Sequence, residues 1–175
     1  MKNRLIIWQF GGLLATSIGG AFLHFLYDLT KSKFTAAFSA VNESTWEHMK
    51  LLFFPMFIYA IIQSRFFRNY KSYWCIKLIG ILLGLILIPM LFYTYNGVLG
   101  KSPDFINIAI FFISAAISYF IEYRLFIKNT IDCKALWLCF MIICLIAALF
   151  ILFTFITPKI PLFKDLITGG YGLIW

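Results

Sequence analysis

The chain has 175 residues, of which 62% are hydrophobic, 20% aromatic and 13% charged. Soluble domains carry about 25% charged residues and about 45–50% apolar ones, so this composition leaves too little polar surface for a water-soluble particle. The formal charge of +8 is spread along the chain without forming a basic stripe, which excludes a nucleic-acid-binding module. The composition therefore predicts an integral membrane protein whose main partner is the lipid bilayer, with no nucleic acid.

Long apolar runs divide the chain into candidate membrane spans. Runs of about 20 mostly apolar residues are typical of transmembrane helices. Five such spans are predicted, at residues 5–27, 46–63, 72–95, 105–123 and 135–157. The first run is too long for the apolar core of a signal peptide, so we expect it to be retained as a helix. The predicted fold is all-α, a polytopic bundle that forms a single transmembrane domain over residues 1–175.

Two segments outside these runs are expected to lie at the membrane surface. Between the first two spans, apolar residues recur at the spacing of one helical face: Phe34, Ala37, Phe38 and Val41. This pattern predicts a short interfacial helix within residues 28–41, with a plain loop as the alternative. The tail, residues 158–175, is too short to span a membrane and is rich in proline and glycine. We expect it to be a surface loop, either unstructured or folded as a lid, with a re-entrant element as a further alternative.

The distribution of charge predicts the orientation. Short cytoplasmic loops of membrane proteins are enriched in lysine and arginine. With a cytoplasmic N-terminus, the inner segments carry eight cations and two acids: Lys2, Arg4, Arg65, Arg68, Lys71, Arg124, Lys128 and Lys134, with Glu122 and Asp132. The outer segments carry six cations and five acids. This bias predicts a multi-pass cell-membrane protein with an extracytoplasmic tail, and it places Glu122, Arg124 and Lys128 at a solvated inner end.

Small residues and cysteines suggest how the helices pack. Gly12, Thr16 and Gly20 recur every four residues, and Gly80 and Gly84 have the same spacing, which favours close helix–helix contact in lipid. The cysteines have no spacing typical of a metal site: Cys75, Cys133, Cys139 and Cys144. In the predicted topology they lie in helices or on the reducing side, so we expect free, buried thiols.

Both histidines of the chain lie beside carboxylates at the predicted outer ends of the first two spans. His24 and Asp28 are four residues apart and share a helical face. The second span opens with Glu43, Glu47 and His48, which lie on one side of that helix or at its border. Because consecutive spans are antiparallel, these side chains are expected to converge at the membrane–water boundary.

One hypothesis for this group is a metal site with hydrolytic activity. Two imidazoles with one or two carboxylates suit a divalent ion such as Zn, Fe or Mn. In this hypothesis His24, Asp28 and His48 are the metal ligands, and Glu43 and Glu47 are the catalytic residues. One glutamate would act as the base for a metal-activated water that attacks a lipid head group.

The same group is also compatible with a ligand-binding role and with a purely structural one. It could hold a small polar ligand in a substrate-binding or accessory subunit that works with a membrane partner subunit, because ionisable residues at membrane depth are often functional. That transport hypothesis predicts a cavity lined by Asn107, Ser114 and Ser118. In the structural role, Ser44 and Glu47 form a capping box, Glu47 reaching back to the Ser44 amide, while the histidines form ion pairs, His24 with Asp28 and His48 with Glu43 or Glu47.

The start of the second span also carries a resemblance. The stretch Val-Asn-Glu-Ser-Thr-Trp-Glu-His-Met-Lys at 41–50, with His-Phe-Leu-Tyr-Asp at 24–28 before it and Leu-Leu-Phe-Phe-Pro after it, resembles a family of small bacterial integral membrane proteins of unknown function. The resemblance runs along most of the chain, including the tail. It implies a membrane location and a bacterial setting, and it brings no activity and no catalytic residues.

Overall fold

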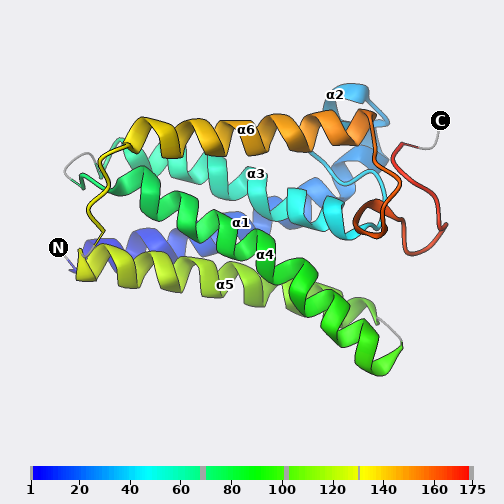
Figure 1. Cartoon of the computed structure of the whole chain (residues 1–175), viewed down its shortest axis with the longest axis horizontal. Helices are drawn as coiled ribbons and strands as arrows, with labels where there is room; N and C mark the ends of the chain where they lie inside the picture. The colour runs from blue at the N-terminus through cyan, green and yellow to red at the C-terminus, as the bar shows by residue number, and fades with distance from the viewer. Residues whose placement is uncertain (1, 68–69, 101–102, 130, 174–175) are drawn as a thin grey trace.

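The computed structural model describes residues 2–67, 70–100, 103–129 and 131–173; Arg68 and Lys101, which enter the charge bias, and the last two residues of the tail lie outside these ranges. The described elements are α1 (Lys2–Thr30), α2 (Lys33–Ala36), α3 (Thr45–Ser64), α4 (Tyr73–Leu99), α5 (Asp104–Lys128), α6 (Leu136–Phe155) and the 3₁₀ turn η1 (Pro161–Phe163) (Figure 1). Within these ranges no strand occurs, so the all-α prediction is confirmed.

Four of the helices are long and apolar enough to cross a membrane, which indicates a membrane protein. They are Lys2–Thr30, Tyr73–Leu99, Phe105–Lys128 and Leu136–Phe155. The remaining long helix, α3, has 20 residues but begins with Glu47, His48 and Lys50, which lower its hydropathy. The exact number of spans and their orientation stay predictions.

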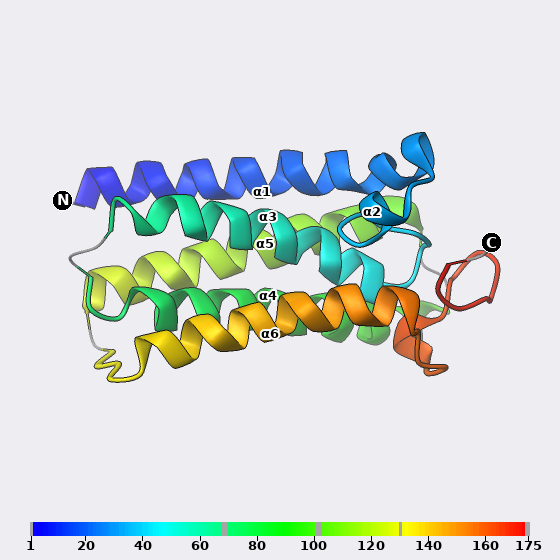
Figure 2. The ribbon, with the colours of Figure 1, turned by 90° about the horizontal axis from the view of Figure 1, so that it is seen from above.

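The helix α3 lies inside the bundle and contacts all four of the other long helices (Figures 1 and 2). Its residues Leu52, Phe53 and Ala60 have no exposed surface. Polar residues at its start are therefore surrounded by protein groups that can act as partners. This environment explains how a helix of moderate hydropathy is held at the centre of an apolar bundle.

Small residues allow the close helix contacts that the sequence predicts. Gly12 of α1 lies against the rings of Tyr59 and Tyr119, and a side chain there would meet both. In α4, a Cβ at Gly84 would lie 2.6 Å from Ser118 Oγ on α5. A hydrogen bond of 2.8 Å between Thr16 Oγ1 and the Tyr119 hydroxyl joins α1 to α5. The predicted packing role of these residues is thus confirmed.

The connection between α1 and α3 contains the expected short helix, but only as one turn. Ser32 caps α2, its hydroxyl oxygen accepting a hydrogen bond from the Phe34 amide at 3.2 Å. After α2 the chain turns back on α1, where the Tyr27 amide donates to Ser39 Oγ at 2.9 Å and the Ser39 hydroxyl donates to the Leu23 carbonyl. These bonds hold the connection against the end of α1 and so position the segment that follows.

Candidate functional site

The segment 41–50 enters α3 through a local hydrogen-bond network. Ser44 is the N-cap, and its hydroxyl accepts from the Glu47 amide at 3.4 Å, as the capping box predicts. The second half of that prediction is wrong. The Glu47 carboxylate accepts from the Val41 amide at 3.2 Å, whereas the Ser44 amide donates to Asn42 Oδ1 at 3.0 Å. Because Asn42 closes this turn, Glu43 stands just before the helix with its side chain toward α1.

Glu43 lies between the two histidines. His24 Nε2 on α1 is 3.6 Å from Glu43 Oε1, and His48 Nε2 on α3 is 3.5 Å from Glu43 Oε2. The two imidazole centroids are 6.0 Å apart. The side chain of Glu43 is 38% exposed, so the carboxylate is open to a ligand while it contacts both rings. The predicted convergence of His24, Glu43 and His48 is therefore present.

The second ring nitrogen of His48 sets its hydrogen-bonding state. His48 Nδ1 is 2.9 Å from the Ser44 carbonyl oxygen, which can only accept, so Nδ1 carries the proton. In neutral His48, Nε2 then presents a lone pair toward the Glu43 carboxylate. Two acceptors that face each other at 3.5 Å require a proton, a cation or a donor group between them.

A groove adjoins the two histidines between α1, α3 and α5. Its volume is about 230 Å³, and it is lined by Ser17, Gly20, Ala21, His24, Phe25, His48, Leu51, Asn107, Ile108, Phe111 and Phe112. Phe25, Ile108 and Phe112 are 61%, 57% and 44% exposed. They belong to α1 and α5, both apolar enough to cross a membrane, so the groove opens on an apolar outer surface of the bundle. One end of the groove is polar and its walls are apolar.

Asp28 and Glu47 do not join this cluster. Asp28 pairs with Lys31 at 2.6 Å, and both side chains are mostly exposed. Asp28 thus takes a lysine three residues away, and His24 contacts Glu43 in place of the expected Asp28. Glu47 points to the interior of the bundle and is buried, whereas Glu43 is partly exposed. The structure therefore assembles three of the five predicted site residues.

Glu47 and Lys50 form a closed, buried ion pair. Lys50 Nζ is 2.6 Å from Glu47 Oε2, and the two side chains are 0% and 3% exposed. The ammonium also donates to the Ala36 carbonyl at 2.9 Å and to Thr154 Oγ1 at 3.0 Å. Three donated bonds use the full capacity of a lysine ammonium. This pair links α3 to α2 and α6, and it has a structural role.

The tail is folded over the same end of the bundle. The Asp165 carboxylate accepts from the amides of Glu43 at 3.3 Å and Ile167 at 3.1 Å, and from the Thr168 hydroxyl. Burial raises the pKa of Asp165, but these hydrogen bonds outweigh it and bring the pKa below its ordinary value. Asn42 Nδ2 donates to the Gly172 carbonyl at 3.1 Å. Of the expectations for the tail, the structure has the folded one, and it fixes the backbone of Glu43.

The cavity that the transport hypothesis predicts is only partly present. Asn107 lines the groove, but Ser114 and Ser118 are fully buried. The Ser118 hydroxyl donates to the Ser114 carbonyl at 2.8 Å, and Gly84 packs against it. The two serines therefore contribute to helix packing and do not line a path to the middle of the bundle.

A second buried ion pair lies near the other end of the bundle, where the sequence predicts a solvated surface. Lys77 Nζ is 2.6 Å from Glu122 Oε2, and the side chains are 1% and 0% exposed. The expectation that Glu122 is solvated is wrong, because its side chain points into α4 against Gly80. Because Gly80 has no side chain, it leaves space for the Glu122 carboxylate. The sequence analysis did not connect this glycine with Glu122.

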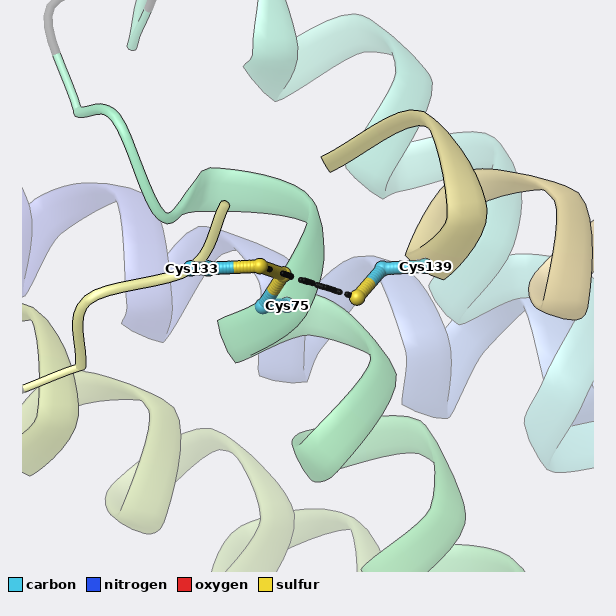
Figure 3. A group of neighbouring side chains, drawn as sticks. All are labelled: Cys75, Cys133 and Cys139. Carbon is cyan, nitrogen blue, oxygen red and sulfur yellow. Dashed lines mark hydrogen bonds between the residues drawn. A yellow bond between two sulfur atoms is a disulfide. The ribbon is translucent and has the colours of Figure 1, made fainter. Parts of the chain in front are cut away.

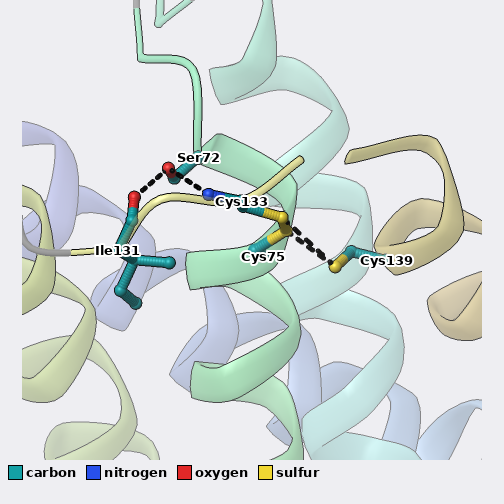
Figure 4. Close-up of a disulfide and its surroundings, with 5 residues drawn as sticks. All are labelled: Ser72, Cys75, Ile131, Cys133 and Cys139. Atoms are coloured by element: carbon teal, nitrogen blue, oxygen red, sulfur yellow. Dashed lines mark hydrogen bonds between the residues drawn. A yellow bond between two sulfur atoms is a disulfide. The ribbon is translucent and has the colours of Figure 1, made fainter. Parts of the chain in front are cut away.

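The cysteines also differ from the expectation of four free thiols. Cys75 and Cys133 form a disulfide, whereas Cys139 and Cys144 are free. Cys139 Sγ lies 2.7 Å from Cys75 Sγ and 3.8 Å from Cys133 Sγ, so three sulfur atoms meet (Figure 3). The Cys133 amide donates to Ser72 Oγ, and the Ser72 hydroxyl donates to the Ile131 carbonyl (Figure 4). Cys75 is 58 residues from Cys133 in sequence, which is why the cysteine spacing gave no sign of this cluster.

Ligand geometry for a metal ion differs between the two clusters. In the described part of the chain, the three cysteines are the one group of at least three metal-ligating residues with ligand atoms within 4.8 Å of one another. His24, Glu43 and His48 do not converge to this extent, because Glu43 offers a different oxygen to each ring. The ligand atoms of His24, Glu43 and His48 therefore surround a common point less closely than the sequence predicts.

Comparison with known proteins places the chain in a family. No curated protein and no solved structure matches it. The model of the family of unknown function DUF6512 matches residues 2–173, and the chain therefore belongs to this family.

Proposed function

We propose that the chain is a multi-pass protein of the cell membrane that binds the polar head of an amphiphilic molecule at His24, Glu43 and His48. In this proposal the N-terminus is cytoplasmic and the site faces the extracytoplasmic boundary. The observation that carries the proposal is the approach of His48 Nε2, an acceptor in neutral His48, to Glu43 Oε2 at 3.5 Å beside an apolar groove. A ligand with a donor-rich head and an apolar chain matches both features.

The chemistry of the two acceptors favours a primary ammonium group. Charge-assisted hydrogen bonds are about 2.7–2.9 Å long. Because the two acceptor atoms are 3.5 Å apart, one ammonium nitrogen can lie at that distance from both of them. A third donor could reach the other Glu43 oxygen. A quaternary ammonium lacks N–H donors, and an anionic head group would be repelled by the carboxylate.

Native mass spectrometry of the detergent-purified chain with three defined lipids tests this proposal. We expect phosphatidylethanolamine to be retained about tenfold more than phosphatidylcholine or phosphatidylglycerol, the ratio that one charge-assisted hydrogen bond supplies. Glu43→Gln should remove the preference while the fold is kept. Asp28→Asn is the matched control, because Asp28 is an acid at the same end that pairs with Lys31 outside the site.

Two results would overturn the proposal. Equal retention of the three lipids by the unaltered chain would show that the site does not recognise a primary ammonium group. A preference for phosphatidylethanolamine that survives Glu43→Gln would place its recognition elsewhere in the bundle.

A divalent metal ion is the second candidate, and one observation favours it. Metal-ligating histidines usually donate their other ring N–H to a backbone carbonyl or carboxylate, as His48 does to Ser44. An ion bound by His48 and Glu43, with His24 moving in, would activate water for hydrolysis of a lipid head group. Elemental analysis for Zn, Fe and Mn tests it. A stoichiometric ion that is lost in His24→Ala and His48→Ala would support this candidate over the amphiphile.

A further inference from the structure

Cys75, Cys133 and Cys139 gather at the end of the bundle opposite the histidines. Cys75 lies in the first turn of α4, Cys139 in the first turn of α6, and Cys133 in the connection between α5 and α6 (Figures 1 and 3). Figures 1 and 2 place the start of α1 at this end, whereas α2 and the tail lie at the other. The two clusters are therefore separate in space, and the cysteine cluster shares with the proposed function only the predicted orientation of the chain.

The protein holds this cluster together by more than the disulfide. Ser72 accepts from the Cys133 amide at 3.4 Å and donates to the Ile131 carbonyl, so the connection is fixed to the start of α4 (Figure 4). The packing of α6 on α4 brings Cys139 to the same place. Reduction of the disulfide would leave these contacts in place, and three thiols would remain close to one another.

The three sulfur atoms are close enough together to bind one thiophilic metal ion after reduction. Thiolates bound to tetrahedral zinc at about 2.3 Å lie about 3.8 Å from each other. The Cys133–Cys139 distance is already 3.8 Å. Cys75 Sγ is bonded to Cys133 and lies 2.7 Å from Cys139 Sγ, so it must move away from both sulfur atoms when the disulfide is reduced. Soft thiolate ligands select ions such as Zn²⁺ and Cu⁺. The chain supplies three ligands, so the fourth position of a tetrahedral ion is left to an exchangeable ligand, as in zinc sites that react or exchange.

The predicted orientation places the cysteine cluster on the side of the membrane where thiols stay reduced and can bind a metal ion. With a cytoplasmic N-terminus the cluster faces the reducing side of the membrane, where disulfides are rarely maintained and clustered cysteines are more often metal-binding or catalytic.

We propose that the reduced Cys75–Cys133–Cys139 cluster binds a thiophilic metal ion such as Zn²⁺ or Cu⁺, and that the Cys75–Cys133 disulfide is its oxidised, metal-free form. A thiol or phosphine reductant supplies two electrons, the S–S bond breaks, and each sulfur takes a proton. Binding of the ion then releases one proton from each of the three thiols. Oxidation by a disulfide or peroxide removes two of the ligands and releases the ion.

The test uses the full chain purified in detergent, reduced with a phosphine under anaerobic conditions and loaded with Zn²⁺, Cu⁺ or Co²⁺. We expect one ion per chain by elemental analysis, and with Co²⁺ a sulfur-to-metal charge-transfer absorption. Oxidation with diamide should release the ion. Cys139→Ser should weaken binding by more than about tenfold, since even outer-shell changes cost that much. Cys144→Ser is the matched control, a free cysteine in the same helix and outside the cluster.

Each contrary outcome contradicts the proposal. A reduced chain that takes up none of the three ions has no such site, and equal binding by Cys139→Ser would show that the third sulfur is not a ligand. If Cys139→Ser changes the melting temperature, the comparison is made with Cys75→Ser and Cys133→Ser. Disulfide mapping that finds Cys75–Cys139 beside Cys75–Cys133, in a chain that holds no metal, would make Cys139 an exchange nucleophile instead.

Discussion

Glu43 and Glu47 lie four residues apart at the start of α3, but they have opposite surroundings. The Glu47 side chain is 3% exposed, and its partner Lys50 donates to three acceptors. The Glu43 side chain is 38% exposed and faces two imidazoles, of which His48 in its neutral form presents a lone pair. A pair with every donor in use has no capacity left for a ligand, whereas Glu43 and neutral His48 have acceptors that a donor can join. One short segment thus contains both a buried structural charge and the site that we propose.

The largest effect expected from this comparison is the loss of Lys50. Lys50→Met leaves the Glu47 carboxylate buried without a counter-charge, and breaking a buried ion pair in this way costs about 3–5 kcal/mol. Glu43→Gln removes a half-exposed charge and should cost less than about 1 kcal/mol. Denaturant unfolding in a fixed detergent measures both. Similar losses in the two variants would show that Glu43 is also part of the framework.

A double variant sharpens the same contrast. Glu47→Leu with Lys50→Met removes both buried charges and should recover much of the stability that Lys50→Met loses, because no unpaired charge is left. A double variant that is as unstable as the sum of its single variants would indicate that the bonds from Lys50 to Ala36 and Thr154 dominate.

The second buried pair predicts a smaller loss through its glycine. Gly80→Ala would place a methyl group against the Glu122 carboxylate, and overpacking of this kind costs about 1–3 kcal/mol. Gly97→Ala in the same helix meets no atom within 4 Å and should be neutral or stabilising by up to about 1 kcal/mol. Melting temperatures of the two variants test this. Equal shifts would mean that Glu122 moves aside without cost.

Sequence reasoning found what depends on neighbours along the chain. The helices follow from apolar runs, the Ser44 cap from its own turn, and the approach of His24 to His48 from the antiparallel order of two consecutive helices. Glu47 pairs inside the bundle with Lys50, whose ammonium also donates to the Ala36 carbonyl and to Thr154, 104 residues away. No local pattern encodes such a partner, so Glu43 and Glu47 look equivalent until α6 is in place.

The same limit explains the other end of the bundle. Cys75 and Cys133 are 58 residues apart, and their meeting depends on how α4, α5 and α6 pack. Glu122 has cations nearby in sequence, Arg124 and Lys128, which suggest a solvated helix end. Its actual partner, Lys77, is 45 residues away. A charge close to a helix end can face solvent or the core, and only the neighbouring helix decides between them.

The stability of the docked tail should change by an intermediate amount on mutation, and it should depend on pH. Asp165→Asn weakens the hydrogen bonds from the Glu43 and Ile167 amides and should destabilise the docked tail by about 1–2 kcal/mol. Because folding lowers the pKa of Asp165, the stabilisation is present above the ordinary pKa of a carboxyl group and is lost as pH falls through the lowered value. The hydrogen-exchange protection factors of residues 160–173, taken relative to the intrinsic amide exchange rate at each pH, should therefore fall in acid. The variant should exchange fast at neutral pH, and protection equal to that of the unaltered chain would contradict this role.

The smallest effect is expected for Asp28→Asn, and it separates the five-residue site that the sequence predicts from the three-residue cluster that the structure assembles. Asp28 and Lys31 are 73% and 65% exposed, so solvent screens their pairing and the melting temperature should not change. Lipid retention and metal content should also be unchanged, because Asp28 pairs outside the cluster. If Asp28→Asn reduces either of them as much as Glu43→Gln does, then Asp28 moves to His24 when a ligand binds. The rotation of one exposed side chain would bring it there, since residues four apart on a helix share a face.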